Sequence, residues 1–171
     1  MTTESIMIRN QWVADARAFY RILKNGDFDW FPTAPPDLET EMAFLRMNAD
    51  KRKAGREFNF SVLLGKRLVG AVGYRPDPQH SHVAEAGYFI DRAYWGRGFA
   101  VQALELVEAH AAKRGLIRLE LLIATDNRQS IRVAEKTGYR REGLLSRKLR
   151  LSRGITDAYL YAKLLKEQVV A

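Results

Sequence analysis

The stretch Tyr88–Val107, YFIDRAYWGRGFAVQALELV, decides the fold of this 171-residue chain. Its first residues are apolar and β-rich, and they predict a strand that ends near Ile90. Gly96 and Gly98 then flank a turn, and from Phe99 onward apolar residues recur with helical spacing. The sequence therefore predicts a strand, a glycine-flanked turn and a helix in direct succession.

The turn lies where a helix begins, and a helix N-terminus presents free backbone N–H groups and the positive end of the helix dipole. Both features favour a bound phosphate. The glycines remove Cβ where a pyrophosphate would come closest, and Gly96 can adopt a positive φ without strain. A Gly-x-Gly pair also occurs as an ordinary connection between a strand and a helix, so the turn alone leaves phosphate binding and a plain turn open.

Two other nucleotide-binding motifs do not fit the sequence. A dinucleotide fingerprint requires a small residue three positions beyond Gly98, where this chain has Val101. A P-loop requires Gly-Lys followed by Ser or Thr, and no part of the chain supplies it. The turn therefore belongs to neither of these classes.

Composition bounds the class of protein. The chain is 47% hydrophobic, contains no apolar run near 18 residues and has no cysteine. These features predict one soluble domain over residues 1–171 without a membrane span. They exclude disulfides, thiolate metal sites and a cysteine nucleophile, and residues 1–9 lack the pattern of a secretory signal. We therefore expect a cytoplasmic location.

The charge is uneven along the chain. Lys and Arg number 28 against 20 Asp and Glu, which gives a net charge of +8. Residues 1–85 hold 12 basic and 11 acidic side chains, whereas residues 86–171 hold 16 and 9. The excess would attract a phosphate-rich cofactor, nucleic acid or an acidic protein surface, but solvated helix and loop faces also account for such charge.

The remaining apolar patterns predict an α/β domain. Strands are expected at residues 6–9, 58–64, 68–74, 83–90, 119–125, 139–151 and 156–164. Helices are expected at residues 13–24, 38–53 and 128–136, besides the one that begins at Phe99. An antiparallel meander comes first, and one strand–helix–strand crossover lies near the centre of the chain.

Several ordered motifs carry a resemblance to a known family. They are Glu85-Ala86-Gly87-Tyr88, then Trp95-Gly96-Arg97-Gly98-Phe99-Ala100, then Asn127, Ser130, Ala134, Lys136, Gly138-Tyr139 and Glu142-Gly143. Together they resemble the GNAT superfamily of N-acetyltransferases, and within it the RimJ/RimL-like branch of ribosomal-protein N-acetyltransferases. The resemblance covers nearly the whole chain. It implies a mixed, mostly antiparallel central sheet with helices on both faces and one central βαβ crossover.

The resemblance implies acetyl-CoA as co-substrate. In similar proteins the turn from Trp95 to Ala100 wraps the pyrophosphate, and pantetheine lies where the strands that end at Ile90 and Thr125 splay apart. Backbone N–H groups near residues 89–91 then polarise the thioester carbonyl. The cofactor-binding residues that it implies are Phe89, Ile90, Asp91, Trp95, Gly96, Arg97, Gly98, Phe99, Ala100, Asn127 and Lys136. No metal is expected, because His80, His82 and His110 do not have the spacing of metal ligands.

Two residues are candidates for acid–base catalysis, since an amine held against a thioester attacks directly once it is deprotonated. Glu85 is the candidate base, acting directly or through water as a partly buried carboxylate; the alternative is a structural carboxylate. Ser130 is the candidate acid for the departing thiolate; the alternative is a first-turn serine that faces water.

Other candidate residues also have structural alternatives. Asn127 either caps the helix that follows it or bonds pantetheine, and the second role is favoured because Asp126 is also available as a cap. In similar proteins the region of Trp30 and Phe31 shapes the acceptor groove. These side chains are expected either to bind the acceptor or to form a hydrophobic plug over the sheet.

The sequence therefore predicts an acetyl-CoA-dependent N-acetyltransferase that acts on a primary amine. A protein N-terminus of the ribosomal-protein type is the favoured acceptor, and a small-molecule amine, antibiotic or amino-acid-like compound is the alternative on the same fold. A third hypothesis is a basic RNA- or ribosome-binding module that keeps coenzyme A only as a ligand, although nucleic acid is not the expected partner. RimJ/RimL-like proteins are often dimers, so a homodimer is a further expectation.

Overall fold

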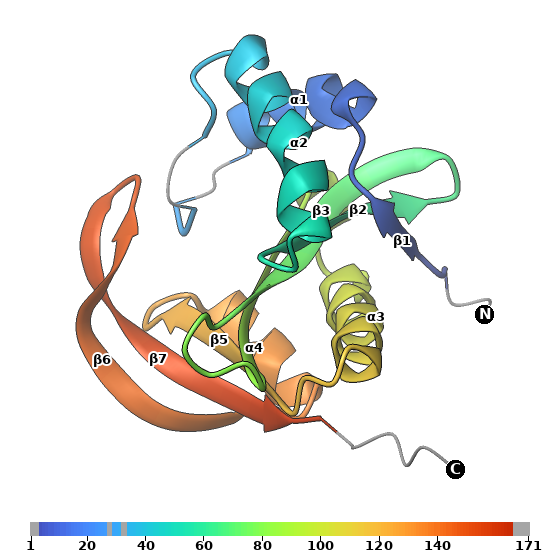
Figure 1. Ribbon diagram of the computed structural model, residues 1–171. Coiled ribbons are helices and arrows are strands. Elements are labelled where there is room, and N and C mark those ends of the chain that lie inside the picture. Colours follow the sequence, from blue (N-terminus) through green and yellow to red (C-terminus); the bar gives the residue numbers. More distant parts are fainter. Residues whose placement is uncertain (1–3, 27–28, 32–33, 166–171) are drawn as a thin grey trace.

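A computed structural model describes residues 4–26, 29–31 and 34–165, and its core is a seven-stranded sheet (Figure 1). The strand order is β1-β2-β3-β4-β5-β7-β6. The strands are β1 (Met7–Asn10), β2 (Phe58–Leu64), β3 (Arg67–Pro76), β4 (Val83–Ile90), β5 (Arg118–Ala124), β6 (Arg140–Leu151) and β7 (Gly154–Leu164). The helices are α1 (Ala16–Asn25), α2 (Leu38–Lys53), α3 (Phe99–Lys113) and α4 (Arg128–Lys136), with short 3-10 turns η1 (Val13–Asp15) and η2 (Arg92–Tyr94).

The strand pairing confirms the predicted fold class. Neighbouring strands pair antiparallel except β4 and β5, which are parallel and are joined through α3. Helices α2 and α4 have the predicted bounds. Each begins after an N-cap residue, Asp37 or Asn127, whose side chain accepts a hydrogen bond from a backbone N–H of the first turn. The helix predicted at residues 13–24 begins as the 3-10 turn η1 and continues as α1.

Helices cover both faces of the sheet. Helices α3 and α4 pack on one face through residues such as Phe99, Val107 and Ala134, and α1 and α2 pack on the other through Phe19 and Leu45 (Figure 1). Because strand residues alternate between faces, β4 directs its even-numbered residues toward α3 and α4 and its odd-numbered residues toward α1 and α2. No helix within the described segments combines the length and apolar character needed to cross a membrane.

The sheet opens between β4 and β5. These strands pair only where Val83–Glu85 lie beside Arg118–Glu120, although β4 continues to Ile90. Beyond Glu85, β4 pairs with β3 alone, while the rest of β5 pairs with β7. The separation expected from the family resemblance is therefore present, and it leaves one edge of each strand without a strand neighbour.

The β6–β7 hairpin bends toward the layer formed by α1 and α2 (Figure 1). Irregular pairing after Arg141 and after Leu145 interrupts its ladder, and such bulges increase strand curvature. Near the hairpin turn, the backbone N–H of Ser152 donates to the carbonyl oxygen of Phe31 at 3.1 Å. The hairpin thereby contacts the connection between α1 and α2 across the opening in the sheet.

Candidate active site

The glycine turn presents a row of free backbone N–H groups. Gly96 and Gly98 have φ of 75° and 79°, in the left-handed region that favours glycine. Gly98 is the N-cap of α3, and its carbonyl accepts the N–H of Gln102 at 3.1 Å. Within the described part of the chain, the backbone N–H groups of residues 99–101 donate to no acceptor, as expected for a first helical turn. The turn therefore has the donors that an anion requires.

The side chain of Trp95 joins the turn to the end of β4. Its indole Nε1–H donates to the carbonyl oxygen of Ile90 at 2.7 Å. The backbone N–H of Asp91 donates to the carbonyl oxygen of Val69 at 2.8 Å. This N–H is therefore occupied in the structure, so of the three residues expected to face a thioester carbonyl, Asp91 has its backbone donor already bonded.

A large cavity, about 1030 Å³, passes through the opening between β4 and β5. On one side it reaches the glycine turn and α4, and on the other it reaches α1, α2 and the β6–β7 hairpin. The predicted site residues that line it are Trp30, Phe31, Glu85, Phe89, Ile90, Trp95, Gly96, Gly98, Phe99, Ala100, Asn127, Ser130 and Lys136. Residues that are far apart in the sequence thus meet around one space.

Asp91 and Arg97 are the predicted site residues that do not line the cavity. The guanidinium of Arg97 forms an ion pair with Glu4 and lies over the rings of Tyr94 and Phe99, at 5.3 and 5.0 Å from their centroids. Its charge is engaged by Glu4 and these two rings. A phosphate contact from this side chain would require it to leave these partners.

Asn127 acts as a helix cap in this structure. Its Oδ1 accepts the backbone N–H of Ser130 at 3.1 Å. Asp126, which sequence reasoning offered as an alternative cap, instead accepts the indole N–H of Trp30 at 3.2 Å and pairs with Arg153 at 2.6 Å. The expectation that Asp126 would cap the helix in place of Asn127 is therefore wrong, although Asn127 does line the cavity.

Ser130 has a partner that sequence reasoning missed. The hydroxyl of Tyr88 donates to Ser130 Oγ at 3.2 Å, across the gap between β4 and α4. Burial raises the pKa of Tyr88, so its phenol stays protonated and able to donate. Forty-two residues separate the pair, and the family motif contains both residues without indicating that they touch.

Glu85 lies at the point where the two strands separate. It stands beside Arg75 of β3 and Glu120 of β5 in the sheet. The expected partial burial is not found, because Glu85 is exposed. Gly87, two residues further along β4, is paired with Gly73, and a Cβ built at Gly87 would meet no atom of the described residues within 4 Å.

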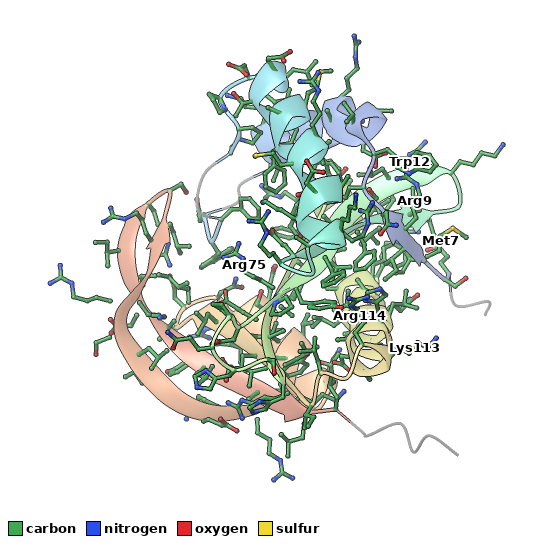
Figure 2. The ribbon with its side chains drawn as sticks, in the orientation of Figure 1. Met7, Arg9, Trp12, Arg75, Lys113 and Arg114 are labelled. Atoms are coloured by element: carbon green, nitrogen blue, oxygen red, sulfur yellow. The ribbon has the colours of Figure 1, made fainter. Side chains whose placement is uncertain are left out.

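Several charged residues on the α1 and α2 side of the cavity were not predicted. Glu41 of α2 is 6% exposed, and burial raises its pKa. Glu57 pairs with Lys51 at 3.0 Å and with Arg75 at 3.8 Å. In Figure 2, Arg75 lies between the helices and the β6–β7 hairpin, where it lines the cavity with these carboxylates.

Trp30 and Phe31 are half-buried at the cavity wall. Phe31 packs edge-on against Phe89 with ring centroids 5.3 Å apart, while the indole N–H of Trp30 is bonded to Asp126. Both side chains therefore cover the sheet and also face the cavity. The geometry is compatible with either of the two roles expected for them.

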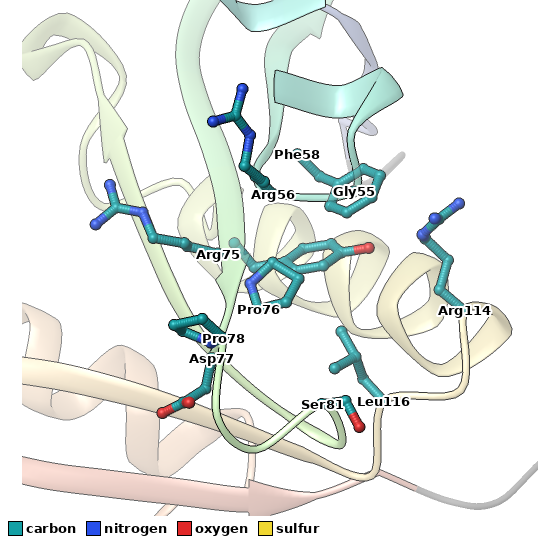
Figure 3. Close-up of a pocket in the computed structure, with 11 residues that line it drawn as sticks. Gly55, Arg56, Phe58, Arg75, Pro76, Asp77, Pro78, Ser81, Arg114 and Leu116 are labelled. Atoms are coloured by element: carbon teal, nitrogen blue, oxygen red, sulfur yellow. The ribbon is translucent and has the colours of Figure 1, made fainter. Parts of the chain in front are cut away.

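A second, smaller hollow of about 470 Å³ lies at the far end of β3 (Figure 3). Figure 3 shows Arg56, Arg75 and Arg114 around its rim. Tyr74 lies between the two hollows and bonds Nδ1 of His110 through its hydroxyl at 2.9 Å. This hollow contains none of the glycine turn or α4, so the larger cavity is the candidate active site.

Comparison with known proteins identifies the family. The sequence profile described as acetyltransferase (GNAT) domain matches residues 6–140. The chain belongs to the GNAT acetyltransferase family. Among its relatives, the uncharacterized N-acetyltransferase YoaA of Bacillus subtilis is 31% identical over 150 residues, covering 85% of each chain. The ribosomal-protein-serine acetyltransferase of Escherichia coli is 31% identical over 110 residues, 64% of this chain and 62% of that protein.

Solved GNAT structures share the fold. RimJ of Mycobacterium smegmatis, solved in complex with CoA-disulfide, superposes with a TM-score of 0.86 at 24% sequence identity. The match covers 93% of this chain and 81% of that one. At this identity the likeness establishes the arrangement of the sheet and helices, which confirms the predicted GNAT architecture.

Proposed function

We propose that this GNAT protein transfers the acetyl group of acetyl-CoA directly to a primary amine, with a protein N-terminal amine of the ribosomal-protein type as acceptor. The main support for this proposal is the cavity, which leads from the free N–H groups of the glycine turn through the opening between β4 and β5. A molecule with a diphosphate at one end and an extended amide-bearing arm fits these features. The relative RimJ is known in complex with CoA-disulfide.

Basic side chains contribute to the coenzyme side of the cavity. Arg132 and Lys136 of α4 line the same cavity as the glycine turn and add positive charge to it. The unpaired edges of β4 and β5 can bond the amides of pantetheine as a further strand would. We assign the diphosphate to backbone N–H groups of residues 96–101, with Lys136 as a supporting cation.

In the proposed reaction the acceptor ammonium first loses a proton, and we assign this step to Glu85 acting through water, because its carboxylate is exposed. The amine nitrogen then attacks the thioester carbonyl and forms the C–N bond. The C–S bond breaks as the tetrahedral intermediate collapses, and the nitrogen loses its second proton to water. We assign Ser130 as the donor of the proton to the thiolate, and the phenol of Tyr88, bonded to Ser130 Oγ, can replace that proton.

The acceptor is proposed from the relatives and tested by a screen. One relative is named for acetylation of a ribosomal-protein serine. The screen compares peptides that differ in their first residue with small amines, and it measures release of free thiol from acetyl-CoA. Preferential turnover of peptides supports the proposed acceptor, whereas turnover of small amines alone supports the small-molecule alternative.

A third result would remove the enzymatic proposal. If no amine is acetylated while RNA binds tightly with a steep salt dependence, the chain is a binding module. If acetyl transfer occurs, Glu85→Gln and Ser130→Ala should each lower kcat about 10²-fold or more while leaving the Kd for acetyl-CoA unchanged. Glu120→Gln is the matched control for Glu85, since Glu120 is its neighbour in the sheet but does not line the cavity.

We also propose that residues 1–171 act as a single catalytic domain, in the cytoplasm, and as a homodimer. Sedimentation of the purified chain measures the last of these directly. A monomer at micromolar concentration would contradict it without affecting the proposed chemistry.

A further inference from the structure

Glu41 is a buried carboxylate on the wall of the active-site cavity. It lies in the first turn of α2 and shares one buried face of that helix with Leu45 and Asn48. Only 6% of the residue is exposed, and the cavity is the space that it reaches. Burial of this kind is costly for a carboxylate unless it is neutralised or hydrogen-bonded.

No such compensation is found in the described part of the chain. Glu41 forms no hydrogen bond or ion pair there through its side chain. The two other carboxylates buried to a similar degree behave differently: Asp15 pairs with Arg9 at 2.7 Å, and Glu108 pairs with Lys163 at 2.5 Å. The missing partner of Glu41 is therefore unusual within this protein, and it suggests a ligand of opposite charge.

Residues of β3 and β4 border the part of the cavity beside Glu41. On the face of the sheet that α1 and α2 cover, Ala71 stands opposite Phe89, and Gly73 stands opposite Gly87. All four residues line the cavity together with Glu41. A Cβ built at Gly87 would meet no atom of the described residues within 4 Å, whereas at Gly73 it would meet the carbonyl oxygen of Phe58 and the side chain of Asn59. The open space that gives a substrate amine access from the strand opening toward the α2 wall therefore lies over Gly87.

We propose that Glu41 binds the ammonium group of the acceptor and makes the enzyme selective for cationic amines. The inference rests on the proposed acetyl transfer and adds a specificity-determining residue to it. The chemical class of acceptor is then a primary ammonium, either the free N-terminus of a peptide or a protonated alkylamine. Neutral nucleophiles such as alcohols would leave the Glu41 charge without a partner and are excluded by the cost of that burial.

The other charges that face this side of the cavity agree with the assignment. Glu57 is already neutralised by Lys51 and Arg75, and Glu85 is exposed to solvent. Arg132 and Lys136 lie on the coenzyme side. Glu41 is therefore the buried acid on this wall whose charge is not already matched.

Binding of the ammonium by Glu41 is consistent with the number of protons gained and lost in acetyl transfer. The acceptor enters as R–NH3⁺ and pairs with the Glu41 carboxylate. It then loses one proton through water toward Glu85 and solvent, and the neutral nitrogen forms the C–N bond while the C–S bond breaks. The products are the N-acetyl compound, the thiol of CoA and one released proton, so no further reactant is needed.

The test compares Glu41→Gln with wild type, and Glu39→Gln is the matched control. Glu39 lies in the same helical turn but is exposed and pairs with Arg46 on the surface. The probes are acetyl-CoA and a peptide that begins with serine, and three quantities are measured: the KM for the peptide, the Kd for acetyl-CoA and the thermal midpoint.

Glu41→Gln is expected to raise the peptide KM about ten- to hundred-fold, since one charged hydrogen bond is lost, while the Kd for acetyl-CoA stays unchanged. It is also expected to raise the thermal midpoint, because a buried unpaired charge is removed. A structural role would lower the midpoint instead. Glu39→Gln should leave all three quantities near the wild-type values.

Two results would overturn the inference, and they are distinguishable. If wild type acetylates the peptide and Glu41→Gln has the same KM, Glu41 does not bind the ammonium and the proposed function stands. If wild type binds acetyl-CoA but acetylates neither the peptide nor n-butylamine, the proposed function fails and the inference fails with it.

Discussion

Replacing Gly98 with alanine separates the stability of the glycine turn from its role in binding. Gly98 has φ of 79°, and a Cβ built there meets no atom of the described residues within 4 Å. The cost to folding is therefore that of a left-handed L-residue, about 1–2 kcal/mol. For a domain of this size, that corresponds to a fall in Tm of about 2–8 °C.

The effect on coenzyme binding should be larger. Gly98 lines the cavity directly before the free backbone N–H groups of residues 99–101, so a methyl group added there lies close to the proposed diphosphate site. If it displaces the diphosphate from one charge-assisted hydrogen bond, the loss is about 1.5–3 kcal/mol, or roughly a 10- to 150-fold rise in Kd. Isothermal titration calorimetry with CoA measures this rise, and scanning fluorimetry measures Tm.

Gly115→Ala is the matched control for this prediction. Gly115 follows the other end of α3, has φ of 82°, and its Cβ would also meet nothing within 4 Å. It does not line the cavity. Both variants should lose similar stability, but only Gly98→Ala should lose affinity for CoA. Equal CoA affinities in the two variants would refute the assignment of phosphate to the turn.

Three further predictions concern stability. Lys163→Met leaves the buried carboxylate of Glu108 without its cation. This variant should lower the free energy of unfolding, measured by urea denaturation, by about 3–5 kcal/mol. A change below about 1 kcal/mol would contradict the assignment of this ion pair. Trp95→Phe removes the hydrogen bond to Ile90 and should cost about 1 kcal/mol in the same assay; no loss would show that the bond is not needed. Burial opposes ionisation of Asp15, but the hydrogen bonds that its carboxylate accepts outweigh burial and lower its pKa below 3.8. Its stabilisation is thus present above the unfolded-state pKa and is lost as pH falls through the folded-state pKa, so Asp15→Asn should flatten the acid side of the stability curve. An unchanged acid limb would be inconsistent with that pairing.

The fold was predictable because most of its signals are local. The spacing of apolar residues and the caps Asp37 and Asn127 define α2 and α4, and both helices have the predicted bounds. The glycine turn also has a local cause, since only residues tolerant of positive φ can form it. These features depend on neighbours within one or two turns, which a single sequence displays.

The contacts within the site were less predictable because they are long-range. Sequence position suggested partial burial for Glu85, but exposure depends on how far β4 and β5 separate. The bond between Tyr88 and Ser130 joins residues 42 positions apart. Glu41 recurs with Leu45 at helical spacing, but an acidic residue in that pattern does not reveal that its helix face meets a cavity.

The proposed function requires acetyl-CoA to lie along the glycine turn and between β4 and β5. NMR detects this placement through backbone amide chemical shifts during titration with acetyl-CoA. We expect the largest shifts at residues 96–101 and 86–90, with small changes at Gly115 and β1. Saturation with acetyl-CoA that leaves these two segments unchanged would contradict it.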